Sequence, residues 1–203
     1  AHAYAYEAAL VDLRNLHRNT RDGLHMASLA GAWTALVQGF GGLRDDEGEE
    51  RAPPVMLDWM PWNHTMGGNA AFNPVLVDGG TLYIDDGNPT PTGVEKTVRN
   101  LKDASPTWYF NVPKGFEALV PLLDADPELR RSLFRNLKML WYAGASLAQH
   151  TWAALDRLAV ETVGERVVIG TGLGATETAP AALMCTWPQE RAGNVGLPCF
   201  GVS

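Results

Sequence analysis

Apolar residues recur along the chain with two different periods, which separate a helical start from a mixed remainder. Helical spacing over residues 6–16 and again over 29–40 predicts two amphipathic helices, separated near Asp22-Gly23. The glycine-flanked acidic run at 45–50 is typical of a solvated linker. We therefore expect a helical N-terminal segment at 1–43, an acidic linker at 44–54 and an incomplete α/β subdomain at 55–203.

Beyond the linker, short β-rich runs alternate with helical stripes. The runs predict strands at 55–59, 81–84, 107–110, 139–142 and 167–169, and the stripes predict helices around 94–101, 116–123 and 152–159. Asp126-Pro127-Glu128 predicts the start of a further helix that runs through Phe134, because the aspartate accepts free backbone N–H groups and proline has none to lose. Such alternation predicts an α/β fold, a three-layer sheet with flanking helices.

Composition narrows the classes of partner. A hydrophobic content of 46% over 203 residues allows a real core, and the net charge of −7 argues against a surface that attracts nucleic acid or anionic lipid. We expect neither a nucleic-acid nor a membrane partner, since no apolar run approaches the roughly 20 residues that span a bilayer. Two cysteines with no disulfide framework and no zinc spacing favour a reducing, cytoplasmic setting.

The segment 172–178, Gly-Leu-Gly-Ala-Thr-Glu-Thr, follows the apolar run at 167–169 and is the first candidate for chemistry. Glycines allow backbone N–H groups to approach a phosphate, Thr176 adds a donor, and Glu177 is a hard oxygen ligand of the kind that Mg²⁺ prefers. A plain tight turn is the alternative. A dinucleotide-binding loop is disfavoured, because it requires a helix at the last glycine and residues 175–180 do not favour one.

Two further clusters follow strands. Residues 58–69 combine two indoles, paired glycines and His64, which suits an apolar pocket with one titratable group, although a lone histidine can equally be structural. Residues 143–147 are small and permit close approach of a flat ring, or simply tight strand-to-helix packing. Ser146 lacks the Gly-x-Ser-x-Gly setting of a hydrolase nucleophile.

Six ordered blocks carry a resemblance to a known family. They are DWMPWNHTMGGN at 58–69, GGTLYIDDG at 79–87, YFNVPKGFE at 109–117, AGASLAQ at 143–149, GLGATETAP at 172–180 and GNVGLPCFG at 193–201. Together they resemble the adenylate-forming (ANL) superfamily of acyl-CoA synthetases, most closely the feruloyl-CoA synthetase type. The resemblance covers residues 55–203 and is weaker over the first fifty.

The resemblance implies a two-step reaction, in which a small carboxylic acid attacks the α-phosphorus of ATP and the thiol of coenzyme A then displaces AMP. It implies that Thr176 contacts the nucleotide phosphate, that Glu177 helps to hold Mg²⁺, and that His64 orients the carboxylate as the third catalytic residue. The residues implied to bind the nucleotide are Gly144, Ala145, Ser146, Gly172, Leu173, Gly174 and Thr176. Those implied to bind the acid are Trp62, His64, Met66, Gly67, Asn111 and Val112.

Departures from the family pattern leave alternatives open. The family usually has an aromatic residue where Leu173 stands, and its phosphate loop, ribose-binding segment and mobile C-terminal domain are not found in the sequence. We therefore expect a partial chain that forms no acyl-adenylate at a useful rate by itself, and the pattern is compatible with a homodimer. The alternative is a non-catalytic α/β module for ligand binding or association. A third interpretation replaces coenzyme A with the pantetheine arm of a carrier protein.

Overall fold

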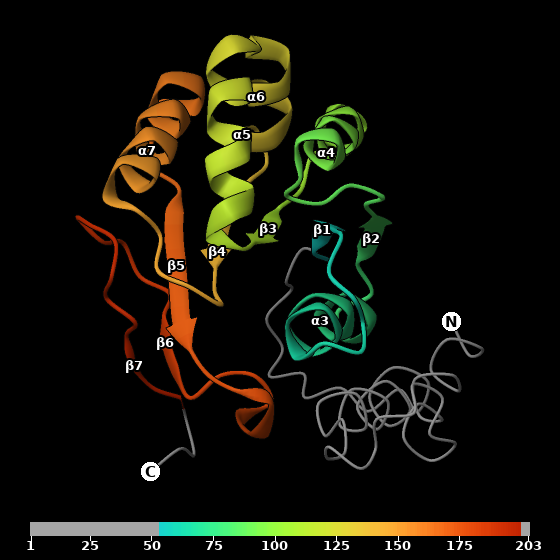
Figure 1. Cartoon of the computed structure of the whole chain (residues 1–203), viewed down its shortest axis with the longest axis vertical. Coiled ribbons are helices and arrows are strands. Elements are labelled where there is room, and N and C mark those ends of the chain that lie inside the picture. Colours follow the sequence, from blue (N-terminus) through green and yellow to red (C-terminus); the bar gives the residue numbers. More distant parts are fainter. Residues whose placement is uncertain (1–52, 200–203) are drawn as a thin grey trace. The chain divides into compact units, whose positions relative to one another are not determined.

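The structure is a computed structural model that describes residues 53–199 (Figure 1). The predicted helices at 6–16 and 29–40 and nearly all of the predicted linker lie outside the described residues. The described chain forms two compact units, which we treat separately. The helical unit contains residues 53–54, Met60–Thr81 and Gly174–Pro180, and the sheet unit contains Val55–Trp59, Leu82–Leu173 and residues 181–199.

Seven strands form one mixed sheet, in the order β2-β1-β3-β4-β5-β6-β7. The strands are β1 Val55–Asp58, β2 Thr81–Ile84, β3 Trp108–Asn111, β4 Met139–Tyr142, β5 Val168–Leu173, β6 Leu183–Cys185 and β7 Leu197–Pro198. Strands β1, β3, β4 and β5 pair in parallel, whereas β6 and β7 are antiparallel. The α/β fold class and the five predicted strands are therefore confirmed; their ends differ from the prediction by at most one residue, except that β5 ends four residues later.

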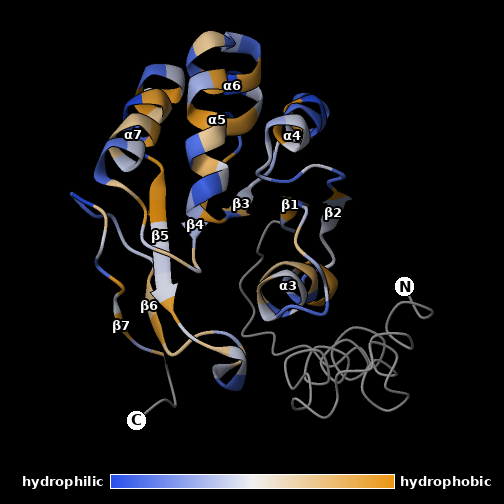
Figure 2. Cartoon of the chain, in the orientation of Figure 1, coloured by the Kyte–Doolittle hydropathy of each residue, from blue (hydrophilic) through white to orange (hydrophobic). Residues whose placement is uncertain are grey.

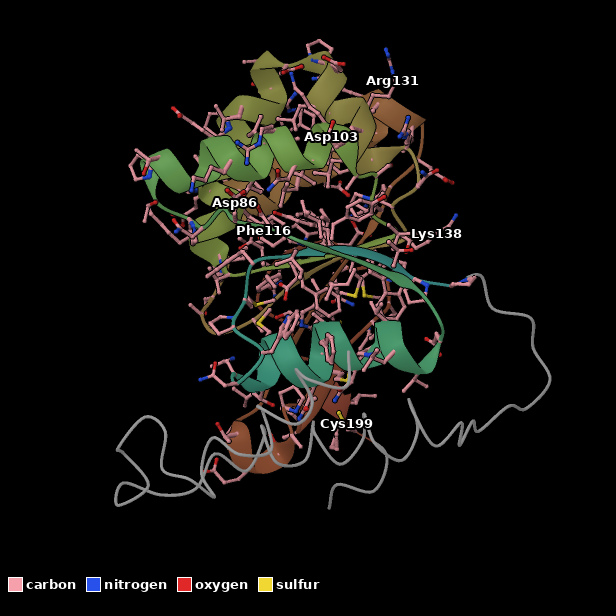
Figure 3. The ribbon with its side chains drawn as sticks, turned by 90° about the vertical axis from the view of Figure 1, so that its right-hand side faces the viewer. Asp86, Asp103, Phe116, Arg131, Lys138 and Cys199 are labelled. Carbon is pink, nitrogen blue, oxygen red and sulfur yellow. The ribbon has the colours of Figure 1, made fainter. Side chains whose placement is uncertain are left out.

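Four helices cover one face of the sheet (Figures 1 and 3). They are α4 Pro91–Asp103, α5 Pro113–Ala125, α6 Pro127–Phe134 and α7 Gln149–Val163. Their apolar stripes meet the strands in one core, where Phe116 of α5 lies between the helices and the sheet and packs edge-on against Tyr109 of β3 at a centroid distance of 6.0 Å. Asp103 and Arg131 stand on the outer surface of these helices (Figure 3). The alternation of strands and stripes thus predicts this layer correctly.

The predicted start of α6 is confirmed in detail. The carboxylate of Asp126 accepts hydrogen bonds from the backbone N–H groups of Glu128 and Leu129, both at 3.0 Å, with Pro127 at the first helical position. Lys102 lies 2.7 Å from the same carboxylate, and this contact, followed by the backbone hydrogen bonds, lowers the pKa of Asp126. The aspartate therefore joins the end of α4 to the start of α6.

The helical segment that follows His64 was not predicted from the sequence. A π-helix, η3 Met66–Phe72, continues directly into α3 Asn73–Val77. Gly67 and Gly68 disfavour a helix by intrinsic propensity. They are required by packing, because a Cβ on Gly67 would collide with the carbonyl oxygen of Pro61 and one on Gly68 would lie 2.5 Å from that of Trp62. Tertiary contact therefore overrides local preference at this point.

The end of β5 also differs from expectation. The predicted glycine loop after residue 169 is strand as far as Leu173, which pairs with Leu183 of β6. Figure 2 shows that β5 changes along its length from hydrophobic to near-neutral hydropathy. A Cβ on Gly170 would lie 2.7 Å from the Trp141 indole, and one on Gly172 would lie 2.5 Å from the carbonyl oxygen of Leu183. The absence of side chains at these two glycines therefore lets the Trp141 indole and the backbone of β6 pack directly against β5.

No helix among residues 53–199 is both long and apolar enough to cross a lipid bilayer.

Candidate active site

The carboxyl ends of three parallel strands lie level in the sheet unit. Asn111 of β3 pairs in register with Tyr142 of β4, and Tyr142 pairs with Thr171 of β5. The Thr171 hydroxyl donates to the carbonyl oxygen of Tyr142 at 2.8 Å, which ties β4 to β5 at this edge. Ligands of open α/β sheets bind outside the carboxyl ends of the strands, so this edge is where candidate residues are expected.

Asn111 is buried, and both its amide nitrogen and its carbonyl oxygen form hydrogen bonds within the protein. Its amide group donates to the Tyr109 hydroxyl at 3.1 Å, while its carbonyl oxygen accepts from the Trp59 indole at 3.2 Å and from the backbone N–H of Val112 at 2.9 Å. A Cβ on Gly115 would collide with this side chain, so α5 begins directly against it. Asn111 thus links β3 to the end of β1 and to the start of α5, and half-buried Val112 stands beside it as the N-cap of that helix.

The candidate base-binding turn follows β4. Gly144, Ala145 and Ser146 are exposed, and Gly144 has a φ of +86°, a backbone conformation that favours glycine. Leu147 is 4% exposed and fixes the end of the turn in the core. The turn therefore presents small residues to solvent at the carboxyl edge of the sheet.

The end of β5 contributes two more candidates. Gly172 is half-buried, whereas 57% of the Leu173 side chain is exposed, and the loop proper begins at Gly174. Leu173 therefore offers an aliphatic contact at the same edge of the sheet unit.

In the helical unit, His64 is exposed and its ring orientation is fixed. Its Nδ1 atom accepts a hydrogen bond from the backbone N–H of Met66 at 3.1 Å. In the neutral imidazole the hydrogen is therefore on Nε2, which makes this atom a donor. A donor suits the orientation of a carboxylate.

The neighbours of His64 form the body of the helical unit. Trp62 is half-buried and its indole stacks on Phe72 at a centroid distance of 4.6 Å, while Met66 and Gly67 are buried. The structure thus places the last two beneath the surface, where they shape the loop that carries His64.

Thr176 and Glu177 lie in the short 3-10 helix η4 Thr176–Thr178, and both are exposed. The hydroxyl oxygen of Thr178 accepts from the backbone N–H of Ala175 at 2.9 Å and lies 2.8 Å from the carbonyl oxygen of Pro180, so it closes the turn. Ala179 has a φ of +52°, which is unusual for a residue with a side chain. The absence of a long helix here agrees with the sequence prediction.

A single hydrogen bond joins the two candidate segments of the helical unit. The Asn69 side-chain amide in η3 donates to the carbonyl oxygen of Ala179 at 3.4 Å, across 110 positions of sequence. The same amide group donates to Thr65, and its carbonyl oxygen accepts from Asn73. The helix that follows His64 and the turn that carries Glu177 therefore belong to one compact unit, together with Trp62 and Gly174. The candidates at the ends of β3, β4 and β5 belong to the sheet unit.

A buried polar cluster at the end of β2 was not predicted as a site. Asp85 is 6% exposed and accepts hydrogen bonds from the backbone of Gly87 and from the side chains of Thr97 and Asn100, at 2.6–2.8 Å. Burial raises the pKa of Tyr109, and the negative charge of Asp85 raises it further. The signal in the sequence is Asp-Asp-Gly after a strand, and the cluster fixes the turn into α4.

The carboxylate of Glu177 fits a magnesium ion held jointly with a ligand. It is exposed and forms no ion pair with another described residue, and no three His, Cys, Asp or Glu side chains within residues 53–199 gather as a metal site. Mg²⁺ is usually bound by one or two carboxylates together with substrate phosphates and water. One exposed carboxylate is therefore a sufficient protein contribution.

Comparison with known proteins decides the family. The family model described as AMP-binding enzyme matches residues 25–203, which is most of the chain. The chain belongs to this family. The predicted membership of the adenylate-forming superfamily is therefore confirmed. The predicted α/β fold, that of the N-terminal domain of such enzymes, is confirmed as well.

Solved structures of ligases share the fold. A malonyl-CoA ligase with methylmalonyl-CoA and AMP bound is 23% identical with a TM-score of 0.55, and an anthranilate CoA ligase in complex with anthranoyl-AMP is 20% identical with a TM-score of 0.57. Each comparison covers 86% of this chain, but only 33% and 30% of the respective ligase. The chain thus spans about a third of the length of these two ligases.

A curated relative of a different kind matches a short region. An uncharacterized glycosyl hydrolase of Mycobacterium tuberculosis is 79% identical over 58 residues, which is 29% of this chain and 7% of the relative. The chain spans less than a tenth of that protein, so the match carries no activity.

Proposed function

We propose that this chain carries part of the active site of an ATP-dependent ligase that converts a carboxylic acid to an acyl-adenylate and then to a thioester with coenzyme A. Membership of the AMP-binding family supports the use of a nucleotide. The observation that carries the proposal is the hydrogen bond from Asn69 to Ala179, which holds the turn of Glu177 and the helix after His64 in one unit.

The first step of this reaction joins two anions. A carboxylate oxygen of the acid attacks the α-phosphorus of ATP, the bond from that phosphorus to the bridging oxygen breaks, and pyrophosphate leaves. In the second step the thiol sulfur of coenzyme A attacks the acyl carbon, the thiol proton is lost, and AMP leaves. Such transfers depend mainly on positioning and on stabilisation of charge.

Each candidate residue has a role that its placement allows. The Nε2–H of His64 donates to the carboxylate of the acid and so orients it, and the Thr176 hydroxyl contacts the α-phosphate. Glu177 would hold Mg²⁺ beside the phosphates, where the ion supplies charge neutralisation.

The other candidates border the base and the acid. Gly144, Ala145 and Ser146 after β4, with Gly172 and Leu173 at the end of β5, border the adenine. Gly174, the first residue of the helical unit's turn, is assigned to the nucleotide by the resemblance. For the acid, the resemblance assigns Trp62, Met66 and Gly67 in the helical unit, and Asn111 and Val112 in the sheet unit. The buried members of each set would act by positioning exposed neighbours.

The substrate is proposed to be a flat aryl acid such as ferulate, because of the resemblance to feruloyl-CoA synthetases and the bulk of Trp62. Pyrophosphate exchange with ferulate and ATP tests catalysis by this chain alone, which we expect to be negligible. The carrier-protein alternative predicts a pantetheine arm as the acceptor, and acyl transfer to coenzyme A or to a carrier protein in the full-length enzyme separates the two.

Calorimetry with a non-hydrolysable ferulate-adenylate analogue and Mg²⁺ tests the proposal directly. Glu177→Gln should weaken binding about tenfold, since a charged interaction is lost. Glu165→Gln is the matched control, because Glu165 is another exposed glutamate and it precedes β5 rather than following it. Binding that is unchanged by Glu177→Gln, or absent from a folded wild-type chain, would refute the proposal, and absence would favour the non-catalytic module.

A further inference from the structure

A short segment between β6 and β7 is held against the sheet unit at several points. We call residues 189–193 the strap. Arg166 donates to the carbonyl oxygen of Gln189 at 2.6 Å and to the carboxylate of Glu190 at 3.1 Å, and its guanidinium lies 5.6 Å from the centre of the Trp152 ring. These contacts fix the start of the strap beside α7.

The other end of the strap is bound at two positions that flank the turn after β4. The backbone N–H of Ala192 donates to the side-chain oxygen of Gln149 at 3.0 Å, and the backbone N–H of Gly193 donates to the Tyr142 hydroxyl at 3.4 Å. Tyr142 is the last residue of β4 and Gln149 the first of α7. Ala192 also packs against the core.

The turn itself has few restraints of its own. Gly144, Ala145 and Ser146 are exposed, and within residues 53–199 none of them forms a hydrogen bond to another described residue. Buried Leu147 fixes one side. Fixing the backbone of one residue in a single conformation costs roughly 1–2 kcal/mol of conformational entropy. If both ends of this three-residue turn are already held in place, less of that entropy is lost when the turn binds a flat ring, and the ring binds more tightly.

We propose that the strap pre-orders this turn for a nucleotide base, and that Gln149 is the positioning residue through which it does so. The inference rests on the proposed function, because it takes the turn as the place where the adenine binds. Gln149 acts through the strap and need not touch the nucleotide. It is exposed at the first residue of α7, so it can be replaced without opening the core.

The test combines amide hydrogen exchange with calorimetric binding of AMP. Gln149→Met keeps length and helix propensity but removes the acceptor for Ala192, whereas Gln149→Glu keeps an acceptor. His150→Ala is the matched control, one position further along α7. We expect faster exchange over 143–148 and 189–193 in Gln149→Met and AMP affinity lower by about three- to tenfold, as the loss of one net hydrogen bond predicts. Gln149→Glu should restore both, and His150→Ala should change neither.

The outcomes separate the two proposals. If the wild-type chain binds AMP and Gln149→Met binds it equally well, the strap has no positioning role, although the proposed function survives. Unchanged exchange in Gln149→Met would refute the inference in the same way. If the folded wild-type chain binds no AMP, the proposed function fails and the inference fails with it.

Discussion

The two glycines of β5 provide a sharp test of why this strand is glycine-rich. A methyl group at Gly170 would meet the Trp141 indole at 2.7 and 3.0 Å and the carbonyl oxygen of Cys185 at 3.0 Å. At Gly172 the nearest atom is the carbonyl oxygen of Leu183 at 2.5 Å, with the indole further away at 3.1 Å. Both alanine substitutions should therefore destabilise the protein, but for different reasons.

The magnitudes follow from which atom must move. Inserting one methyl group into a tightly packed site lowers the free energy of unfolding by about 1–3 kcal/mol. Trp141→Leu removes the indole, so it should recover about 1 kcal/mol or more of the loss in Gly170→Ala. In Gly172→Ala the collision is with the backbone carbonyl of Leu183, which Trp141→Leu does not remove. The losses caused by Gly172→Ala and by Trp141→Leu should therefore add to within about 0.5 kcal/mol.

Urea unfolding, followed by far-UV circular dichroism of the single and double variants, measures these couplings. Gly144→Ala is the control, since its Cβ would meet nothing within 4 Å and its φ of +86° alone makes the substitution unfavourable. It should show no coupling to Trp141. Additive losses for Gly170→Ala with Trp141→Leu, or equal coupling at both glycines, would refute the packing argument and favour a role in ligand binding.

Three further predictions concern other parts of the structure. Tyr109→Phe leaves the buried amide of Asn111 without its acceptor, and we expect a loss of about 1–3 kcal/mol in urea unfolding; a neutral result would contradict the network. The contact with Lys102 lowers the pKa of Asp126, so this carboxylate contributes stability above its usual value of 3.8, and the contribution is lost as pH falls through the lower folded-state pKa. Acid titration of thermal stability should therefore show Asp126→Asn to be less acid-sensitive than the wild type below about pH 5, and parallel curves would contradict this. His64→Ala should weaken binding of the adenylate analogue while thermal stability changes little, and equal losses of both would make His64 a structural residue.

Periodicity predicts most of the sheet unit. The sequence predicted five strands, four helices and the cap at Asp126, because each has an apolar stripe or a local start signal that agrees with its tertiary role. The helical segment at 66–77 could not be predicted. Its Gly67 and Gly68 are required by carbonyl groups of residues 60–62 that pack against them, and local helix propensity does not register such contacts. Strands β6 and β7 are too short to show a period.

The candidate site was readable only as separate segments. Sequence motifs indicated Thr176, Glu177 and His64, and the structure finds all three exposed. The motifs did not show that the Asn111 side chain is hydrogen-bonded to Trp59, Tyr109 and Val112, because such contacts depend on strand register. The strap was likewise invisible, since its contacts to Gln149 and Tyr142 join distant positions through backbone N–H groups.

The bond between Asn69 and Ala179 has a consequence for the order in which the molecule is built. Strands β4 and β5 each pair with the strand before them in the chain, across about 30 positions, whereas this contact closes a loop of 110. Loop-closure entropy for that length is about 4 kcal/mol in the simplest chain model. We therefore expect the turn of Glu177 to dock late, after the parallel strands β3, β4 and β5 have assembled, so that a substitution which slows assembly of the sheet also slows the docking of this turn.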